Sequence, residues 1–523
     1  MPFIANLGMI AKPEMSLISR QNHTDSHYPM TSPRTAIGSA ENDLLASARS
    51  IVARTALVSG LALGLAACGG GGSSSAPPSG GGGGGGGTGA CSIANQIAFA
   101  DDVLNDWYLF PNLLDNTVNP SNFSTVQSFL DARVAPARAS GRDEGFTFAT
   151  SIAEENALIA SGSSAGIGIR LSYDVNQNRV FILEAFEGAP GFIAGMDRGT
   201  ELLAIGTNAS NAQSVSSLMA SGGPAAVSDA LGPTEGGVTR FIRFETADGN
   251  VIAQNITKAE FSLDPISDRY GVQILNDGGK QVGYINLRTF IVEDAARQLR
   301  EAYGQFAAAG VTELIIDFRY NGGGLVDVAD TMGDLMGQGR QGDVWSRTLF
   351  NALRSNRNST DLFDFENNSI RPTKIAFIGT GSTASASELV INSMLPYLAD
   401  ANVALVGEDT LGKPYGQFGF DLADCDLRIR ALTFETVNAD NEGDYFNGIA
   451  ELMPNTCRAG DDPAFALGDP QEASTMAALD FLGGRSCTPF SSSDPLAPQA
   501  SRSRQMLRPA NPTAAQFEIP GLY

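Results

Sequence analysis

The chain has 523 residues, which is more than one compact domain usually holds, so its length predicts two or three folded units. Apolar residues make up 43% of the sequence, enough to form hydrophobic cores. The formal net charge of −23 argues against nucleic acid or an anionic membrane surface as a partner, because both attract basic proteins.

Residues 1–67 have the features of a signal peptide. An apolar run too short to span a membrane ends in Leu-Ala-Ala-Cys at Cys68, which resembles a bacterial lipobox, where the cysteine is lipidated. An ordinary secretory signal is the alternative. Residues 68–90 are rich in Gly and Ser and predict a flexible tether. We therefore expect a lipid anchor in the cell envelope, on the periplasmic side, and Gly69 favours the outer membrane by analogy with lipoprotein sorting.

Four further cysteines suit an oxidising compartment, since an even number at long spacings favours disulfides over a metal site. Three pairings are open to them, and we expect Cys425 with Cys457 and Cys91 with Cys487.

The histidines restrict the possible chemistry. His23 and His27 are the only two in the sequence, and both precede the expected processing site. A mature chain without histidine has no Ser-His-Asp triad, Cys-His dyad or histidine metal site. A serine nucleophile in this chain would need a different base.

Residues 91–155 carry helical periodicity and predict a small helical unit that serves packing. Residues 160–257 change to short β-like runs broken by glycine. At their head stands a Gly-hydrophobic loop, followed by a short helix between two strands, which resembles the PDZ domain of proteases. The resemblance implies that the loop binds the carboxylate of a peptide that adds as an edge strand. The loop residues are Gly166, Ile167, Gly168 and Ile169. For the loop alone, a β-turn is the alternative.

Residues 262–490 alternate between strand-like and helix-like segments, which predicts an α/β fold with a mostly parallel sheet. Ligands of such sheets bind beyond the carboxyl ends of the strands. Three unusual motifs stand at those ends: DFRYNGGG, STASASE and EDTLGK. The expected strands are residues 281–287, 311–319, 374–380 and 403–409, and the expected helices are 292–310, 325–337 and 385–398.

Ser385 stands three residues before Glu388, the spacing of a capping box, so it is either a helix cap or a nucleophile. At a helix start, the N–H of Ala386 is free to stabilise an oxyanion. Lys413 is the candidate base if burial lowers its pKa from about 10.4 towards 7 or 8. A solvated loop lysine is the alternative. Ser164, in a Gly-x-Ser-x-Gly pattern, lacks both a histidine and a following helix, and is expected in a turn.

The three motifs, in this order after a PDZ-like region, resemble the tail-specific or C-terminal-processing serine proteases, a Ser/Lys family with a crotonase-like core. The likeness covers about residues 160–470. It implies that Ser385 is the nucleophile, that Lys413 is the general base and that Gln417 orients the lysine. It also implies supporting roles for Glu388 and Thr410, and oxyanion N–H groups on Ala386 and on Gly323 or Gly324.

Two residues depart from the family pattern. Pro396 stands where some members have an aspartate, and Pro414 replaces the second glycine of Gly-Lys-Gly. Proline biases Lys413 towards an extended conformation and removes an N–H, which affects the geometry expected around the lysine.

We expect a serine endopeptidase that hydrolyses peptide bonds in proteins near their C-termini or guided by them, without a metal or nucleotide cofactor. The alternative is a non-catalytic PDZ-bearing lipoprotein that binds C-terminal peptides on a decayed protease scaffold. Residues 491–523, rich in Ser, Pro and Ala, are expected to be loose, although the final Glu-Ile-Pro-Gly-Leu-Tyr could dock.

Overall fold

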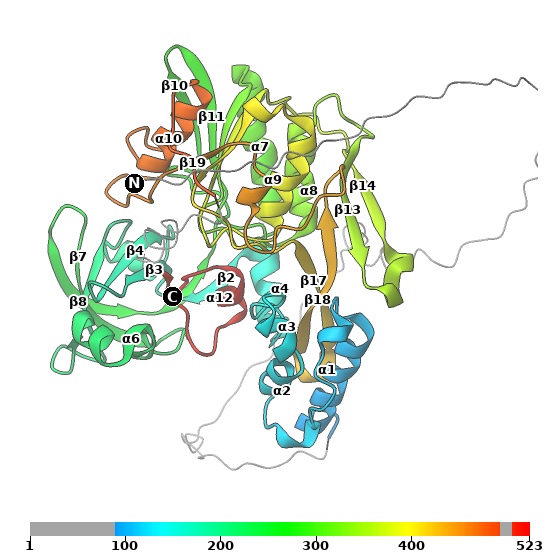
Figure 1. Ribbon diagram of the computed structural model, residues 1–523. Helices are drawn as coiled ribbons and strands as arrows, with labels where there is room; N and C mark the ends of the chain where they lie inside the picture. Colours follow the sequence, from blue (N-terminus) through cyan, green and yellow to red (C-terminus); the bar gives the residue numbers. More distant parts are fainter. Residues whose placement is uncertain (1–88, 492–504) are drawn as a thin grey trace, which may run out of the picture. The chain divides into compact units, whose positions relative to one another are not determined.

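A six-stranded, mostly parallel sheet carries the expected motifs in the computed structural model, which describes residues 89–491 and 505–523 (Figure 1). The strand order is β10-β11-β12-β15-β16-β19, and only β10 pairs antiparallel to its neighbour. The strands are β10 Val272–Asp277, β11 Lys280–Asn286, β12 Glu313–Asp317, β15 Lys374–Gly379, β16 Val403–Gly407 and β19 Thr456–Arg458. The expected signal peptide, Cys68 and nearly all of the tether lie outside the described residues.

Helices cover both faces of this sheet (Figure 1). Because side chains alternate along a strand, Leu314 and Ile316 of β12 face one core while Ile315 faces the other. The first core also contains α7 Ala295–Ala309, α8 Val326–Met336 and α9 Ala386–Met394, and the second contains α10 Ala473–Leu482. A strand that is buried on both sides is typical of a parallel sheet covered by helices on both faces. This is the arrangement that the alternation of strand-like and helix-like segments predicted.

A seven-stranded antiparallel sheet accounts for most of residues 160–257. Its strands are β3 Ile169–Asp174, β4 Arg179–Ala185, β5 Glu201–Gly206, β6 Gln213–Ser214, β7 Thr239–Glu245, β8 Val251–Thr257 and β20 Gln505–Met506. Two helices accompany it, α5 Pro190–Ile193 and α6 Val215–Leu231. α6 bends at Gly223, where the backbone leaves the helical conformation, and its Val227 and Leu231 join the core of this sheet.

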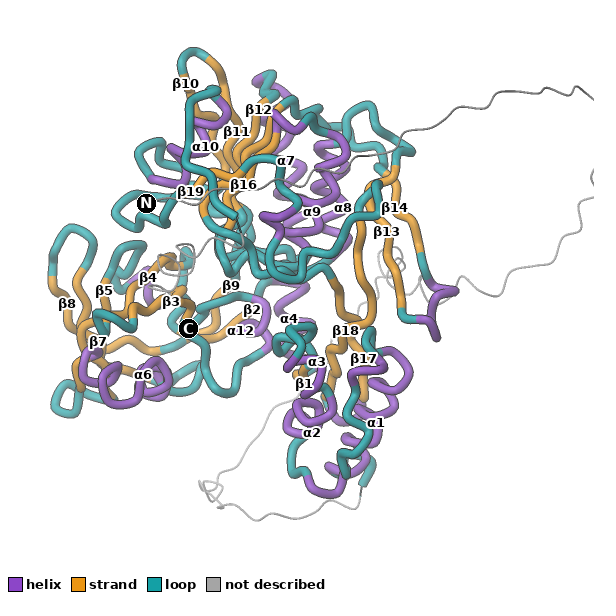
Figure 2. Tube along the Cα trace, in the orientation of Figure 1, coloured by secondary structure: helices purple, strands orange, loops and turns teal. Residues whose placement is uncertain are grey.

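A five-stranded sheet joins the N-terminal helices to the rest of the chain (Figure 2). Its strands are β1 Phe148–Thr150, β13 Val344–Phe350, β14 Ser359–Leu362, β17 Tyr415–Leu422 and β18 Leu427–Val437. The helices α1 Ile93–Trp107, α2 Val126–Arg133 and α3 Ala135–Ala139 pack against β17 and β18 in one apolar cluster. This packing places the N-terminal helices next to the strand that follows Lys413.

Two short strands, β2 and β9, form a separate two-stranded sheet. β2 Ser163–Gly166 pairs antiparallel with β9 Ala259–Ser262, and α4 Ile152–Ser161 precedes β2. Ser164 therefore lies in a strand, opposite Phe261, and the expectation of a turn there is wrong. None of the helices in the described ranges is long and apolar enough to span a membrane.

The disulfide pairing differs from the expected one. Cys91 bonds to Cys425 and Cys457 bonds to Cys487, each pair with Cα atoms 5.3 Å apart. Cys425 lies in the turn between β17 and β18, beside the N-terminal helices, whereas Cys457 lies in β19 of the six-stranded sheet. A disulfide requires Cα atoms within about 4.4–6.8 Å, and the folded chain brings Cys91 to Cys425 and Cys457 to Cys487 at such a distance.

Replacing Cys457 and Cys487 together by serine is expected to lower the free energy of unfolding by about 2–4 kcal/mol, because the bond restricts the unfolded chain. Urea unfolding followed by circular dichroism measures the change. Under strong reducing conditions the wild type and the variant should unfold at the same urea concentration. Equal stability under oxidising conditions would contradict the pairing.

The last residues of the chain are ordered against β3, so the expectation of a loose tail does not hold for residues 505–523. β20 extends the sheet beside β3, and α12 Ala514–Glu518 follows. Leu522 forms a bridge with Arg170, which agrees with docking of the final six residues.

Candidate active site

The three motifs converge at the carboxyl ends of neighbouring parallel strands. Gly323 and Gly324 follow β12, Ser385 follows β15, and Lys413 follows β16. Because β12, β15 and β16 are adjacent and parallel, their carboxyl ends lie at one edge of the sheet. The prediction that motifs distant in the sequence lie at one edge of the sheet is thus confirmed.

Ser385 is the residue before α9 and has an unusual backbone conformation. Its φ of 55° and ψ of −117° lie outside the ordinary regions for a residue with a side chain. Such strain persists only where surrounding contacts fix it, and it is common at functional sites. The following residue, Ala386, is in the first turn of α9, where a backbone N–H has no acceptor within the helix.

The Glu388 carboxylate holds the nucleophile candidate and the lysine together. One oxygen, Oε2, accepts the backbone N–H of Ser385 at 2.9 Å and that of Lys413 at 2.8 Å. The other, Oε1, accepts the hydroxyl of Thr410 at 2.5 Å and the N–H of Gly412 at 2.8 Å. Burial raises the pKa of Glu388 to about 7, against the effect of these hydrogen bonds. Glu388 is therefore a buried support that ties two segments to one side chain.

Replacing Glu388 by glutamine is expected to lower the free energy of unfolding by about 2–5 kcal/mol. An amide keeps one acceptor oxygen, so its NH₂ faces one of the two pairs of donors and leaves buried groups unpaired. Chemical denaturation measures the change. Glu451→Gln is the matched control, because Glu451 is exposed and its replacement should change stability by less than about 0.5 kcal/mol. Equal effects of the two substitutions would contradict the role of Glu388.

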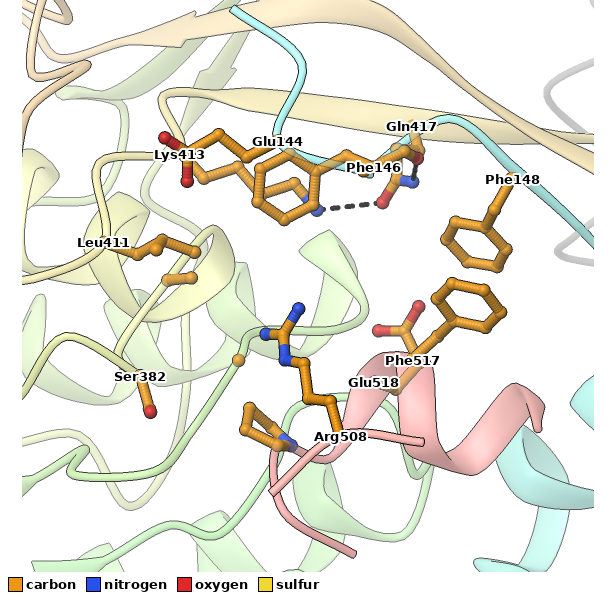
Figure 3. Close-up of a pocket in the computed structure, with 14 residues that line it drawn as sticks. Glu144, Phe146, Phe148, Ser382, Leu411, Lys413, Gln417, Arg508, Phe517 and Glu518 are labelled. Carbon is orange, nitrogen blue, oxygen red and sulfur yellow. Dashed lines mark hydrogen bonds between the residues drawn. The ribbon is translucent and has the colours of Figure 1, made fainter. Parts of the chain in front are cut away.

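Lys413 is buried, with 7% of its surface exposed. Burial lowers the pKa of Lys413 to about 8, while the charges of Glu518, Asp143 and Glu388 oppose this change and that of Arg430 adds to it. Its Nζ donates to Oε1 of Gln417 at 2.9 Å (Figure 3). A lysine amine with this pKa is about half neutral at pH 8, and a general base must be neutral to accept a proton.

The N-terminal region contributes to the lysine's surroundings, which the sequence did not indicate. The Phe146 ring centroid lies 4.2 Å from Lys413 Nζ, and its main-chain oxygen accepts a hydrogen bond from Nε2 of Gln417. Gln417 is thus fixed between the lysine and residue 146, which orients its acceptor oxygen towards Nζ (Figure 3). The hydrogen bond between Gln417 and Phe146 joins residues 271 positions apart, so no local sequence pattern predicts it.

The glycine loop, residues 321–324, packs closely against Ser385. Gly323 has a φ of +108°, and a Cβ on it would lie 2.7 Å from Cβ of Ser385. Its N–H donates to Oδ1 of Asn321 at 2.9 Å, and Nδ2 of Asn321 donates to the carbonyl of Leu287 at 2.8 Å. Gly324 forms a parallel bridge with Phe290 in which the hydrogen bonds involve Gly323 and Leu325, so the N–H of Gly324 takes no part in the bridge.

A pocket beside these residues has walls from three distant parts of the chain. Lys413 and Gln417 form one side, with Phe146 of the N-terminal region, and Arg508 and Glu518 of the last segment lie opposite (Figure 3). Pro414, which follows the lysine, accepts the N–H of Thr436 with its carbonyl at 2.9 Å, which fixes the start of β17. Pro396 lies in the 3-10 turn after α9, outside this pocket.

No group of three or more metal-binding side chains occurs in the part of the chain that the structure describes. The carboxylate loop expected at Gly166–Ile169 lies between β2 and β3, in the seven-stranded region, and does not line the Lys413 pocket.

Comparison with known proteins identifies the family of the segment that carries this site. Residues 281–451 match the model of peptidase family S41, so the chain contains a peptidase family S41 domain. This segment includes β12, β15, β16 and all three motifs.

The similar proteins extend the likeness beyond that domain. The C-terminal processing peptidase of the Tetradesmus obliquus chloroplast is 27% identical over 50% of this chain and 54% of its own length. The carboxyl-terminal-processing protease of Synechocystis is 25% identical over 62% of this chain and 70% of its own length. The chain thus spans about half the length of the algal relative. A solved structure from Bacteroides fragilis, described as a candidate S41 protease, superposes with a TM-score of 0.57 at 22% identity, over 74% of this chain and 97% of the other, and shows a shared fold.

Proposed function

We propose that this protein is a serine endopeptidase that works with a Ser385/Lys413 dyad on a crotonase-like core. The observation that supports it most is the buried Glu388, whose Oε2 holds the backbones of both residues. The peptidase family S41 domain and the names of the two relatives support the class of reaction.

In the proposed reaction, Oγ of Ser385 attacks the scissile carbonyl carbon while Nζ of Lys413 takes its proton. The lysine then gives this proton to the leaving amine, and water hydrolyses the acyl-enzyme with the lysine again as base. Gln417 would hold the amine in place through the hydrogen bond from Nζ to its Oε1. We assign the oxyanion to the N–H groups of Ala386 and Gly324, because the N–H of Gly323 is already donated to Asn321.

Two further assignments concern substrate capture and location. We propose that residues 160–257 act as a PDZ-like domain whose loop at Gly166–Ile169 binds the C-termini of protein substrates. We also propose that Cys68 is the lipidated residue that anchors the protein on the periplasmic side of the cell envelope. Two disulfides support an oxidising compartment.

Replacing Gly323 by alanine is expected to lower peptidase activity by about 100-fold, because its Cβ would displace Ser385 and the φ of +108° disfavours a side chain. Steady-state hydrolysis of a fluorogenic peptide measures the loss. Gly381→Ala is the control, since no atom lies within 4 Å of a Cβ added there. If both variants keep full activity, Ser385 does not need the position the loop gives it.

Incubation with an unstructured protein tests the proposed function itself. Wild type should release fragments that mass spectrometry identifies, and Ser385→Ala and Lys413→Ala should release none. A wild type that releases no fragments but still binds a C-terminal peptide would support the non-catalytic alternative.

A further inference from the structure

The end of the chain binds along β3 as an added strand. The main-chain oxygen of Tyr523 accepts the N–H groups of Gly168 at 2.7 Å and Ile169 at 3.1 Å. The N–H of Tyr523 donates to the carbonyl of Ile169 at 2.9 Å, and the N–H of Leu171 donates to the carbonyl of Gly521 at 2.8 Å. Hydrogen bonds of this kind are how a sheet edge captures an extended peptide.

The approach is close at the loop before β3. A Cβ on Gly166 would lie 3.0 Å from the main-chain carbon of Tyr523, and Gly166 has a φ of +153°. A glycine at this position leaves room for the last residue of the segment. The loop and the segment therefore fit each other as a binding site fits a ligand.

The side chain of Tyr523 fills a pocket between the sheet and α6. Only 1% of its surface is exposed, and it belongs to the apolar cluster that contains Ile167, Val227 and Leu231. Its hydroxyl donates to Oγ of Ser228 on α6 at 3.0 Å. A buried phenol requires a partner, so Ser228 distinguishes a tyrosine from a phenylalanine at this position.

The same segment also lies against the Lys413 pocket. Glu518 and Pro520 line that pocket, and Phe517 stacks on Phe148 with ring centroids 3.8 Å apart (Figure 3). The main-chain oxygen of Glu518 lies 3.0 Å from where a Cβ on Gly322 would be. The segment therefore occupies space directly beside the glycine loop.

Arg170 connects the two places that the segment occupies. This buried guanidinium donates through Nη1 to the carbonyl of Pro520 at 2.7 Å and to that of Tyr320 at 3.0 Å. Tyr320 lies in the turn that precedes Gly323. A single side chain thus links the occupant of the β3 groove to the loop that packs on Ser385.

We propose that residues 505–523 are a tethered ligand of the groove along β3, and that a peptide ending in tyrosine displaces them and thereby opens the Lys413 pocket. The second step, opening of the pocket, rests on the proposed function, in which that pocket is the active site. Ser228 is the residue that selects the last side chain of the peptide. The substrates favoured by this site are protein chains with an aromatic, tyrosine-type C-terminus.

Peptide binding to the Ser385→Ala variant tests the ligand without any need for hydrolysis. The probe is a fluorescent peptide of sequence QFEIPGLY with a free carboxylate, measured by fluorescence anisotropy. A tethered competitor has an effective concentration of about a millimolar, so the unchanged segment should mask the groove. Adding Tyr523→Ala should tighten probe binding at least tenfold, and deletion of residues 505–523 should do the same.

Phe365→Ala is the control, because Phe365 is 70% exposed and far in sequence from the groove; it should leave probe binding unchanged. Equal probe affinity in the Tyr523→Ala variant, the deletion variant and the protein with an unchanged C-terminal segment would overturn the proposal. Both variants are checked for folding by circular dichroism, and either one suffices for the comparison.

The role of Ser228 has its own readout. In the Tyr523→Ala background, Ser228→Ala should weaken binding of QFEIPGLY about fivefold and change that of QFEIPGLF by less than twofold. Equal losses for the two peptides would contradict the assignment of the pocket. If the binding results hold and no variant hydrolyses any substrate, the groove assignment stands and the proposed peptidase function is what fails.

Discussion

Ser385→Ala is expected to lower kcat/KM for an unstructured substrate by about a thousandfold or more, since it removes the atom that forms the acyl-enzyme. The backbone of the site should survive the change. Glu388 accepts the N–H of residue 385, not its hydroxyl, and an alanine keeps that N–H. The free energy of unfolding should therefore change by less than about 1 kcal/mol, which separates a chemical effect from a folding effect.

Ser393→Ala is the matched control for this experiment. Ser393 lies on the same helix, α9, and is buried, and its hydroxyl has no hydrogen-bond partner among the described residues. Its removal should leave both activity and stability close to those of the wild type. A Ser385→Ala protein as active as the Ser393→Ala protein would remove Ser385 from the mechanism.

Lys413 gives the second large effect, in the dependence of rate on pH. The lysine acts as base only when neutral, and its pKa is about 8. The rate should therefore rise tenfold per pH unit below about pH 8 and level off above pH 9. Lys413→Arg keeps a permanent positive charge and should be inactive over the whole range. A rate that is flat from pH 6 to pH 10 would exclude the lysine as base.

Gln417→Glu extends this test to the residue that orients the lysine. A carboxylate in place of the amide would stand near Nζ, which Gln417 Oε1 now contacts at 2.9 Å. An opposite charge at that distance favours the charged amine, so the rising limb of the profile should move up by about one pH unit. Gln417→Ala should lower the rate without such a movement. A limb that stays in place in the Gln417→Glu variant would show that Gln417 does not act on the lysine.

The sequence predicts well that the three motifs meet at one edge of the sheet, because its signals are local. Apolar strand-like runs such as residues 313–317 lie between helical segments, and this alternation places the ends of β12, β15 and β16 together. Ser385 and Glu388 are three residues apart on one helix start, so their relation follows from helix geometry. The role of Glu388 needed the structure, since two of its donors, Gly412 and Lys413, follow a different strand.

Other parts could not be predicted, because they depend on contacts between distant segments. The Phe146 contact with Gln417 and the docking of Tyr523 on β3 join residues hundreds of positions apart. The disulfide partners depend on where the fold places each cysteine: Cys425 lies in the turn between β17 and β18, whereas Cys457 lies in β19 of another sheet. The composition of residues 491–523 suggests looseness, yet five apolar or aromatic positions from residue 514 onward are buried in the folded chain: Ala514, Ala515, Ile519, Leu522 and Tyr523.

Labelling with a fluorophosphonate, which reacts with an activated serine hydroxyl, tests the central claim most directly. Intact-mass spectrometry and peptide mapping of the Tyr523→Ala variant should find one adduct, on Ser385, that forms faster as the pH rises through 8. The adduct should be absent when Lys413 is replaced by arginine. Labelling at another residue, or labelling of Ser385 at the same rate without Lys413, would contradict the Ser/Lys mechanism.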